Sequence, residues 1–328
     1  MMKHAIIDQF DTPRKGKNLG DYVQTLATMQ FCNDPIFVDR EHLDSYCGEK
    51  VKMIMNSWFI SYPKNWPPSD DIEPLFVSSH FTDISLKQIL NEKGKKYFKK
   101  YEPIGCRDTA TCNTLQKNGI NAYFSACLTL TLGKTYKREN IGNEILFIDV
   151  LYNYRTIKEI FFDIFQDTRT FGSRIKRGGI TEVMKIINDL NNRKKYLKKF
   201  FSDELLSRVT FVSQLAKLKR TDNHLQVTDE YLKRLSKAKL VVTSRIHCAL
   251  PCLAIGTPVI FIDSELDQNR VSGLKDLFHT ITIEKKDKIT VNFDCPPKIG
   301  MDFNFVNKTD FVKYKNDLIS KCEKFINQ

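Results

Sequence analysis

The sequence predicts an α/β protein made of two doubly wound halves, each with a parallel sheet covered by helices. Short apolar runs rich in branched residues alternate with segments at helical spacing, which is the pattern of parallel α/β units. This alternation restarts near residue 145, after a polar and basic segment at 134–138. With 328 residues, of which 41% are hydrophobic, the chain is long enough for two cores and is not of a disordered or low-complexity class.

The elements of the first half follow from apolar runs and from signals that end helices. We expect strands at residues 5–7, 36–38, 51–55 and 104–106. A helix is expected through residues 22–29, where apolar side chains recur three and four positions apart. A second helix, over 109–118, should end at Gly119, because glycine adopts without strain the left-handed conformation that often follows a helix.

The second half repeats the pattern. Strands are expected at 145–148, 209–212, 239–244 and 259–263, and helices near 156–166, 180–200, 226–236, 245–255 and 309–326. We therefore expect an N-terminal domain at 1–138, a C-terminal domain at 139–308, and a last helix at 309–328 that could cross back to the first domain. Halves that face each other in this way would hold a ligand between the carboxyl ends of their strands.

Composition and motifs exclude several classes of protein. No apolar run approaches the roughly 18–20 residues that span a bilayer, and Asp8 interrupts the start before a signal-peptide core can form. The nine cysteines are odd in number and include no CxxC pair, which predicts reduced thiols rather than disulfides or a zinc site. The sequence also lacks a GxGxxG, a P-loop and an HExxH motif. We expect a cytoplasmic protein that uses no metal or redox cofactor.

The net charge of +12 is concentrated in one segment. Residues 169–201 contain ten Lys and Arg against two acidic residues. No nucleic-acid-binding module accompanies them, so we expect no nucleic acid partner. Near the end of this segment, aromatic residues are interleaved with Arg193, Lys194, Lys195, Lys198 and Lys199. The stretch could dock on an anionic membrane surface or a diphosphate, or it could be a solvated helix whose aromatic side chains pack on the core.

Polar residues follow three of the expected strands, at the positions where α/β folds bind ligands. In the first junction, the helix N-terminus around Asn18 and Gly20 suits an anion. Asp21 could be a general base there, or it could only stabilise the first helical turn. In the second junction, Arg107 suits a carboxylate or phosphate, unless it pairs with Asp108 or the two residues form a helix cap.

The third junction combines a cation with a titratable group. Ser244 and Arg245 follow a strand, and His247 lies in the first turn of the next helix. A guanidinium beside an imidazole offers an anion clamp and a proton donor, although a histidine with a structural role is the alternative. Two further candidates are weaker: His80 could be a base, and Arg270 could contact a ligand or lie on the surface.

Taken together, these motifs resemble the polysaccharide pyruvyl transferase family. The resemblance covers about residues 5–290 and rests on Asn18-Leu19-Gly20-Asp21 with Gln24 and Ala27, on Arg107-Asp108, and on 242–247 running to Pro258. Residues 56–59, 74–80 and 124–132 are similar to one bacterial subgroup. The chain departs from the pattern at Arg14-Lys15-Gly16-Lys17, where a second glycine is common, and at Ala126, where glycine is expected.

The resemblance implies two Rossmann-like domains facing a central cleft, as in GT-B glycosyltransferases, and transfer of pyruvyl from phosphoenolpyruvate to two hydroxyls of a sugar. The products would be a cyclic pyruvate ketal and phosphate. Arg245 and Arg107 would each hold an anionic group of the donor, His247 would be the general acid, and Asp21 or His80 would take a hydroxyl proton. Further donor contacts are expected from Gly20, Ser244 and Arg270, and acceptor contacts from Asn18, Asn56 and Trp58.

The expected acceptor is a capsular or exopolysaccharide repeat unit on undecaprenyl diphosphate, at the inner face of the cytoplasmic membrane. Two other functions stay open at this level. A nucleotide-sugar glycosyltransferase could share the architecture, because a fold alone does not decide the reaction. A non-catalytic protein could bind a glycan or an anion through Arg245 without turnover.

Overall fold

The structure is a computed structural model that describes most of the chain. The described residues are 2–9, 17–152, 184, 188, 191–216, 223–264, 268–284, 288–304 and 306–328. The helix expected at 156–166 and much of the one expected at 180–200 lie outside them, while residues 191–200 are helical as expected.

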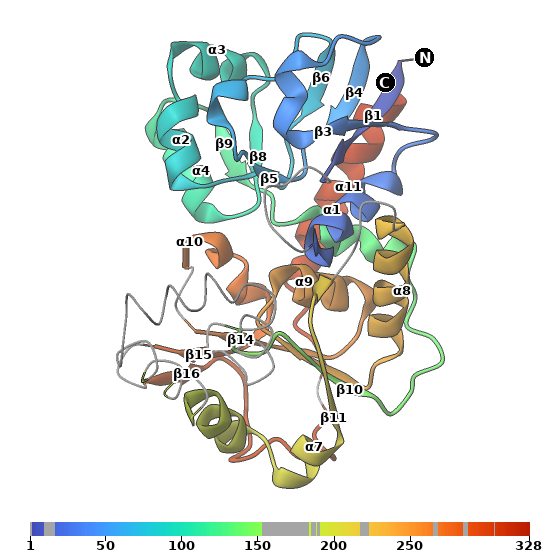
Figure 1. The fold of residues 1–328 in the computed structure, drawn as a ribbon, viewed down its shortest axis with the longest axis vertical. Helices are drawn as coiled ribbons and strands as arrows, with labels where there is room; N and C mark the ends of the chain where they lie inside the picture. The colour runs from blue at the N-terminus through green and yellow to red at the C-terminus, as the bar shows by residue number, and fades with distance from the viewer. Residues whose placement is uncertain are drawn as a thin grey trace.

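The first sheet has four parallel strands in the order β3-β1-β4-β6 and occupies the upper half of Figure 1. Its strands are β1 (Lys3–Asp8), β3 (Ile36–Asp39), β4 (Val51–Ile54) and β6 (Ile72–Leu75). Beyond β6 lie two parallel pairs, β5 (Trp58–Phe59) with β7 (His80–Phe81) and β8 (Ile104–Cys106) with β9 (Ala122–Phe124). The strands expected from apolar runs are thus confirmed. β6 was not expected, because Glu73 and Pro74 interrupt its apolar pattern.

The second sheet has six strands in the order β11-β10-β13-β14-β15-β16. They are β10 (Ile145–Ile148), β11 (Val209–Val212), β13 (Leu240–Thr243), β14 (Val259–Asp263), β15 (His279–Ile283) and β16 (Ile289–Val291). All neighbours are parallel except β15 and β16. Strands β10, β13 and β14 are buried along their whole length, which explains why continuous branched runs identified them in the sequence.

Two helices fill the space between the sheets. These are α1 (Leu19–Met29) and α9 (Ile246–Ile255), seen at the centre of Figure 1. They pack on each other and on η3 (Leu128–Lys134), a 3₁₀ segment within the same apolar core. Gly256 ends α9 with φ 91°, and Gly119 follows α4 (Thr109–Lys117) with φ 74°, so both glycine stop signals are confirmed.

The remaining helices pack around the sheets and the central helices, and one of them, His224–Lys237, packs against both α1 and α9. They are α2 (Asp83–Ile89), α3 (Glu92–Lys100), α7 (Asp203–Arg208), α8 (His224–Lys237), α10 (Gln268–Val271) and α11 (Phe311–Asn327), with the 3₁₀ turns η1 (Arg40–Ser45), η2 (Pro63–Asn65) and η4 (Lys275–Leu277).

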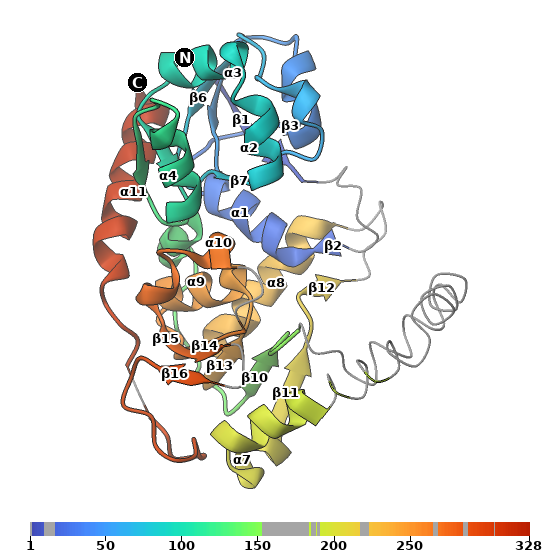
Figure 2. The same cartoon turned by 90° about the vertical axis from the view of Figure 1, so that its left-hand side faces the viewer.

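Several contacts join the two sheets into one molecule. Helix α11 runs back beside the first sheet, where Lys52 Nζ donates to Phe325 O at 2.8 Å, and both chain ends lie close together (Figure 2). Strand β2 (Lys17–Asn18) pairs with β12 (Leu215–Ala216), which belongs to the second half of the chain. The protein is therefore an α/β fold with parallel sheets, and elements from both halves of the chain meet around α1 and α9.

Candidate active site

Four basic side chains gather where the first sheet meets α9 and α10. They are His80 in β7, Arg107 directly after β8, His247 in the first turn of α9, and Arg270 in α10. Arg107, Arg270 and His80 each lower the pKa of His247, so the four groups lie within electrostatic range of one another. We call these four residues the cationic cluster.

Arg107 is fully buried and lacks a hydrogen-bonding partner. Its side chain is 0% exposed, and within the described ranges none of its three guanidinium nitrogens makes a hydrogen bond. The nearest acidic atom is Asp108 Oδ2, 3.9 Å from Arg107 Nε. Burial lowers the pKa of Arg107, which is the direction expected when a cation loses water without gaining a full counter-charge. A guanidinium in this state is suited to bind an anion that brings its own acceptor oxygens.

Asp108 makes its side-chain hydrogen bond to His80 rather than to Arg107. His80 Nδ1 lies 2.6 Å from Asp108 Oδ2, while Asp108 Oδ1 accepts from Thr111 N at 2.8 Å and caps α4. Burial and Arg107 together lower the pKa of His80 to about 4 despite this carboxylate. Burial acts to raise the pKa of Asp108, but His80 and Arg107 outweigh it and the pKa is lowered. At neutral pH the neutral imidazole therefore donates through Nδ1 to an ionised carboxylate, which leaves the Nε2 lone pair of His80 as a base.

His247 lies against the start of α1. A Cβ at Gly20 would stand 3.0 Å from His247 Cβ and 2.8 Å from Gln214 Nε2, so only glycine permits this approach. Burial, followed by Arg107 and Arg270, lowers the pKa of His247 well below its usual value. In the free protein His247 is thus neutral, and it can become an acid only when negative charge enters the cluster.

The first expected junction lies beside this cluster. Asn18 caps α1, with Oδ1 accepting from Gly20 N at 3.1 Å. Asp21, in the first turn, is close enough to Arg107 to raise its pKa. The structure thus brings Gly20 and Asp21 to the same place as His80, Arg107, His247 and Arg270.

Arg245 is held differently from Arg107. Its Nε donates to Asp149 Oδ2 at 2.9 Å, and its guanidinium stacks on the Tyr152 ring at 4.0 Å. Asp149 Oδ2 also accepts from Gln214 N at 3.0 Å. The hydroxyl of Ser244 is already used, because it donates to Ile262 O at 2.6 Å and accepts from Leu151 N at 2.9 Å. Arg245 and Ser244 therefore lie at the strand ends of the second sheet with protein partners.

Of the three expected acceptor residues, Asn18 caps α1, whereas Asn56 and Trp58 lie at the carboxyl edge of the first sheet. Asn56 is buried, and its Nδ2 donates to Gln24 O at 3.2 Å. Trp58 pairs in register with His80, and the Arg40 guanidinium stacks on its ring at 4.8 Å. Both residues are therefore adjacent to His80 through the backbone.

Residues 191–200 of the basic segment belong to the helix that precedes α7, while most of residues 169–190 lie outside the described residues. Lys194, Lys195, Lys198 and Lys199 are exposed, whereas the Arg193 guanidinium lies 5.9 Å from the centre of the Phe211 ring. The apolar residues among them are buried in the core of the second sheet, namely Tyr196, Leu197, Phe200 and Phe201. An apolar membrane-inserting face is thus not available on this stretch, and any membrane contact would depend on the lysines alone.

Sequence reasoning missed three residues that organise this region. Asp149 follows β10 directly, so its place at a strand end was a usable signal. Gln214 and Tyr152 had no such signal. Gln214 links both halves of the chain, because its O accepts from Leu19 N at 3.0 Å while its Nε2 donates to His247 O at 3.2 Å.

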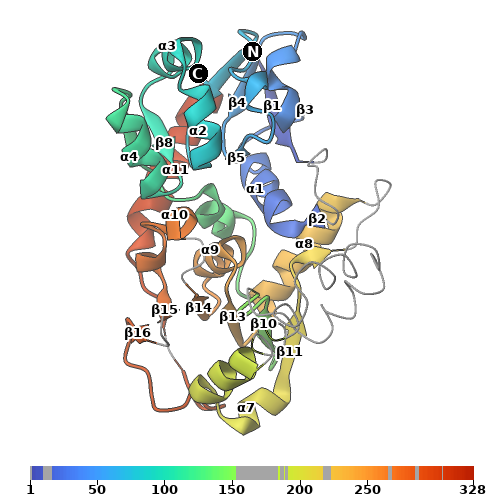
Figure 3. The same cartoon turned by 60° about the vertical axis from the view of Figure 1, so that its left-hand side comes forward.

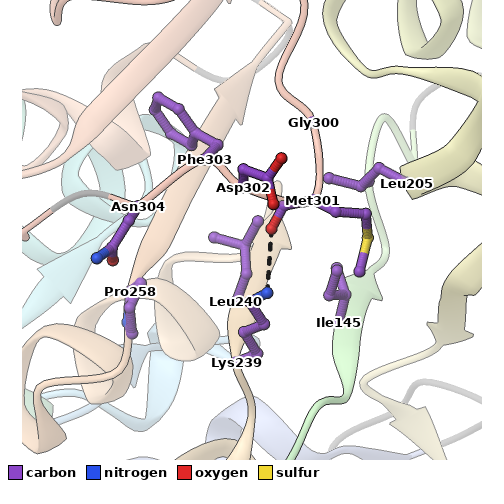
Figure 4. A pocket seen from close by; sticks show the side chains of 10 residues that line it. All are labelled: Ile145, Leu205, Lys239, Leu240, Pro258, Gly300, Met301, Asp302, Phe303 and Asn304. Carbon is purple, nitrogen blue, oxygen red and sulfur yellow. Dashed lines mark hydrogen bonds between the residues drawn. The ribbon is translucent and has the colours of Figure 1, made fainter.

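A cavity of about 320 Å³ opens elsewhere, at the amino edge of the second sheet (Figure 4). Its lining includes Lys239, Leu240, Pro258, Asp302 and Asn304, and Lys239 Nζ donates to Met301 O at 3.0 Å across it. It lies far from the carboxyl strand ends where parallel α/β sheets bind ligands. The cationic cluster is therefore the candidate active site, because the Arg107 guanidinium and Nε2 of His80 and of His247 are buried and make no hydrogen bond to a described residue.

No helix among the described residues is both long and apolar enough to cross a membrane, and no trio of acidic, His or Cys side chains there could hold a metal ion.

Comparison with known proteins supplies the family. A comparison of the chain with curated proteins returns no match. The model of the family described as polysaccharide pyruvyl transferase matches residues 74–265, which include His80, Arg107 and His247. This match covers more than half of the chain, so the protein belongs to the polysaccharide pyruvyl transferase family and is a transferase.

Proposed function

We propose that the cationic cluster binds phosphoenolpyruvate and that the protein transfers its pyruvyl group to two hydroxyls of a sugar. The observation that carries this proposal is the buried guanidinium of Arg107, which makes no hydrogen bond to a described residue. Phosphoenolpyruvate presents a carboxylate and a phosphate, and each is a planar or tripodal set of oxygens that a guanidinium binds through two hydrogen bonds. We assign the second arginine contact to Arg270, because it acts electrostatically on Arg107 and on both histidines of the cluster.

The proposed reaction proceeds in two additions at the same carbon. A proton adds to the methylene carbon of the donor, and the first sugar hydroxyl attacks the resulting cationic carbon and loses its proton to a base. The second hydroxyl then attacks this carbon, and the C–O bond to phosphate breaks. One hydroxyl proton replaces the proton that formed the methyl group, and the other leaves with phosphate. The result is a cyclic ketal and inorganic phosphate.

The two histidines are suited to opposite roles in this reaction. His80 is neutral and oriented by Asp108, so its Nε2 can accept a hydroxyl proton. His247 has its pKa lowered by the neighbouring cations, and a bound trianionic donor would reverse that effect and protonate it. His247 is then the acid that supplies the methyl proton. Asp21 is a second candidate for the base, because it lies near Arg107 at the open end of α1.

We further propose that the two sheets form a GT-B-like pair of Rossmann-like domains with the donor between them. Support comes from the position of the cluster, since His80 and Arg107 follow strands of the N-terminal half while His247 and Arg270 belong to the C-terminal half. Figure 3 shows α10 beside α4, and Thr109 N donates to Ser272 O at 3.2 Å across this junction.

The acceptor in this proposal is a lipid-linked repeat unit at the inner face of the cytoplasmic membrane. Four exposed lysines at 194–199 support a purely electrostatic contact, to which each would contribute about 1 kcal/mol near an anionic surface. Co-sedimentation with vesicles of anionic or neutral lipid tests the contact. Binding to both kinds alike, or no loss when the four lysines are changed to Gln, would contradict it.

The function is tested by incubating the protein with phosphoenolpyruvate and a panel of galactosides, glucosides and N-acetylhexosaminides. We expect release of phosphate together with an acceptor whose mass has increased by that of pyruvate less one water. Nucleotide sugars provide the comparison donor. Transfer from a nucleotide sugar, with none from phosphoenolpyruvate, would contradict the proposal.

A further inference from the structure

Three neutral side chains beside the cationic cluster also have buried polar atoms without partners. Both amide atoms of Gln24, Oδ1 of Asn56 and Oγ of Ser78 make no hydrogen bond to any described residue. The exposed fractions of these residues are 0%, 2% and 0%. A buried polar atom without a partner costs about 1–3 kcal/mol, so a group of them in one place indicates a ligand or bound water.

The three side chains lie on neighbouring segments. Asn56 Nδ2 donates to Gln24 O, which ties the end of β4 to α1. His80 N donates to Ser57 O at 2.9 Å, and Arg107 N donates to Ser79 O at 2.9 Å. The segments that follow β4, β6 and β8 are therefore bonded side by side at the carboxyl edge, with Arg107 at one side of the group.

Helix geometry places Gln24 near the same residues. Gln24 is three positions after Asp21 and four after Gly20, so the three share one face of α1. Asp21 acts electrostatically on Arg107, and Gly20 adjoins His247. The amide of Gln24 thus lies on the face that α1 turns toward the cationic cluster.

The backbone at Ser78 is strained in a way that is typical of functional positions. Ser78 has φ 58°, a left-handed backbone conformation that residues other than Gly, Asn and Asp rarely adopt. Ser78 N donates to Ser125 Oγ at 2.9 Å, which holds this conformation, and Ala126 beside it has φ 57°. The chain thus retains at Ala126 the conformation for which glycine was expected.

We propose that Gln24, Asn56 and Ser78 bind the hydroxyl pair of the acceptor sugar. Amides and hydroxyls both donate and accept hydrogen bonds, as sugar hydroxyls do, whereas carboxylate and phosphate are only acceptors and match the arginines. The three neutral side chains would thus bind the sugar, and the cationic cluster would bind phosphoenolpyruvate. This inference rests on the proposed function. Because the three side chains are buried, the acceptor reaches them only when α1 and the strand ends move apart.

The test uses Gln24→Leu in the full-length protein, with phosphoenolpyruvate and an acceptor found with wild type. We expect KM for the acceptor to rise about tenfold to a hundredfold, since lost hydrogen bonds to a buried site are worth about 1.5–3 kcal/mol. KM for phosphoenolpyruvate should stay within about twofold. Thermal stability should be unchanged or higher. The side-chain amide of Gln24 makes no hydrogen bond to a described residue that the change would remove, and burying an apolar side chain avoids the cost of burying an unbonded amide.

Gln116→Leu is the matched control, because Gln116 Nε2 donates to Ala122 O at 2.8 Å outside the site. It should lower stability and leave both KM values unchanged. If Gln24→Leu lowers stability and leaves the acceptor KM unchanged, Gln24 has a structural or water-binding role and the inference is wrong.

Direct binding separates this inference from the proposed function. Saturation-transfer NMR with methyl galactoside, methyl glucoside and methyl N-acetylglucosaminide needs no turnover. We expect at least one glycoside to bind wild type and to lose its signal in Gln24→Leu. Equal signals in both proteins, or none in wild type, would overturn the acceptor subsite. Absence of phosphate release from phosphoenolpyruvate, with glycoside binding intact, would overturn only the proposed donor.

Discussion

Arg107 and Arg245 occupy similar places, directly after β8 and two residues after β13, yet their surroundings are opposite. Arg107 is 0% exposed and its guanidinium makes no hydrogen bond to a described residue. The Arg245 side chain is 20% exposed, is bonded to Asp149 at 2.9 Å and stacks on Tyr152 at 4.0 Å. A buried cation without hydrogen bonds is retained only at a cost to stability, so we propose that a ligand accounts for Arg107 and the fold for Arg245.

The comparison also separates two parts of the site. Around Arg107, Nε2 of His80 and Nε2 of His247 make no hydrogen bond to a described residue, and Arg107 acts electrostatically on both imidazoles. Around Arg245, the bonds of Asp149 and Gln214 fix the starts of α1 and α9. The first part would contact the donor, and the second would position the elements that contact it.

The largest effect is expected for Arg107→Gln. Loss of two charged hydrogen bonds, each worth about 1.5–3 kcal/mol, should lower kcat/KM for phosphoenolpyruvate by about a thousandfold or more. Steady-state phosphate release measures this. Arg208→Gln is the control, because Arg208 is exposed and forms its ion pair with Glu204 in its own helix. A loss of less than about tenfold would contradict the role of Arg107.

His247→Gln should have the next largest effect. Removing a general acid typically costs about a hundredfold to ten-thousandfold, here in kcat more than in KM. Because the cluster lowers the pKa of His247 in the free protein, donor binding should be accompanied by proton uptake near neutral pH. Calorimetry in buffers of different ionisation enthalpy measures that uptake. Equal uptake in wild type and His247→Gln would assign the proton to another group.

Arg245→Gln and Asp149→Asn should each cost only about tenfold in kcat/KM, since the pair is partly exposed and positions other groups. The double variant should lose little more than either single one, because both changes break one interaction. The comparison between the two arginines fails if Arg245→Gln loses as much activity as Arg107→Gln.

A stability measurement sharpens the comparison without an assay of activity. The pKa of His80 is about 4 in the folded protein and 6.5 in an unfolded chain, so the unfolded state takes up the proton first as the pH falls. The corresponding stability is fully present above pH 6.5 and is lost as the pH falls toward 4. Its size is about 3 kcal/mol, at 1.36 kcal/mol per pH unit.

Denaturant unfolding at several pH values, for wild type and His80→Gln, measures this dependence. We expect the free energy of unfolding of the wild type to fall more steeply over this range than that of the variant. Parallel curves for the two proteins would show that His80 is not held neutral by its surroundings.

Much of the fold was predictable from the sequence, whereas the contacts made by the individual residues of the candidate site were not. Strands β8, β10 and β14 end where apolar runs end, because strands buried on both faces need continuous apolar residues. In β6 and β15 the apolar residues are separated by polar residues or proline, so these strands were not predicted from the sequence. The sequence placed Arg107 and Arg245 at strand ends but gave no sign of which one Asp149 would neutralise. Contacts such as that of Gln214 with His247 depend on tertiary packing alone.

The most direct test of the central role of Arg107 is calorimetric titration of the protein with phosphoenolpyruvate alone. Wild type and Arg208→Gln should bind the donor with the same affinity, while Arg107→Gln should show no measurable binding at the same concentrations. Equal binding by Arg107→Gln and wild type, or no binding by wild type, would contradict the assignment of the cationic cluster as the donor site.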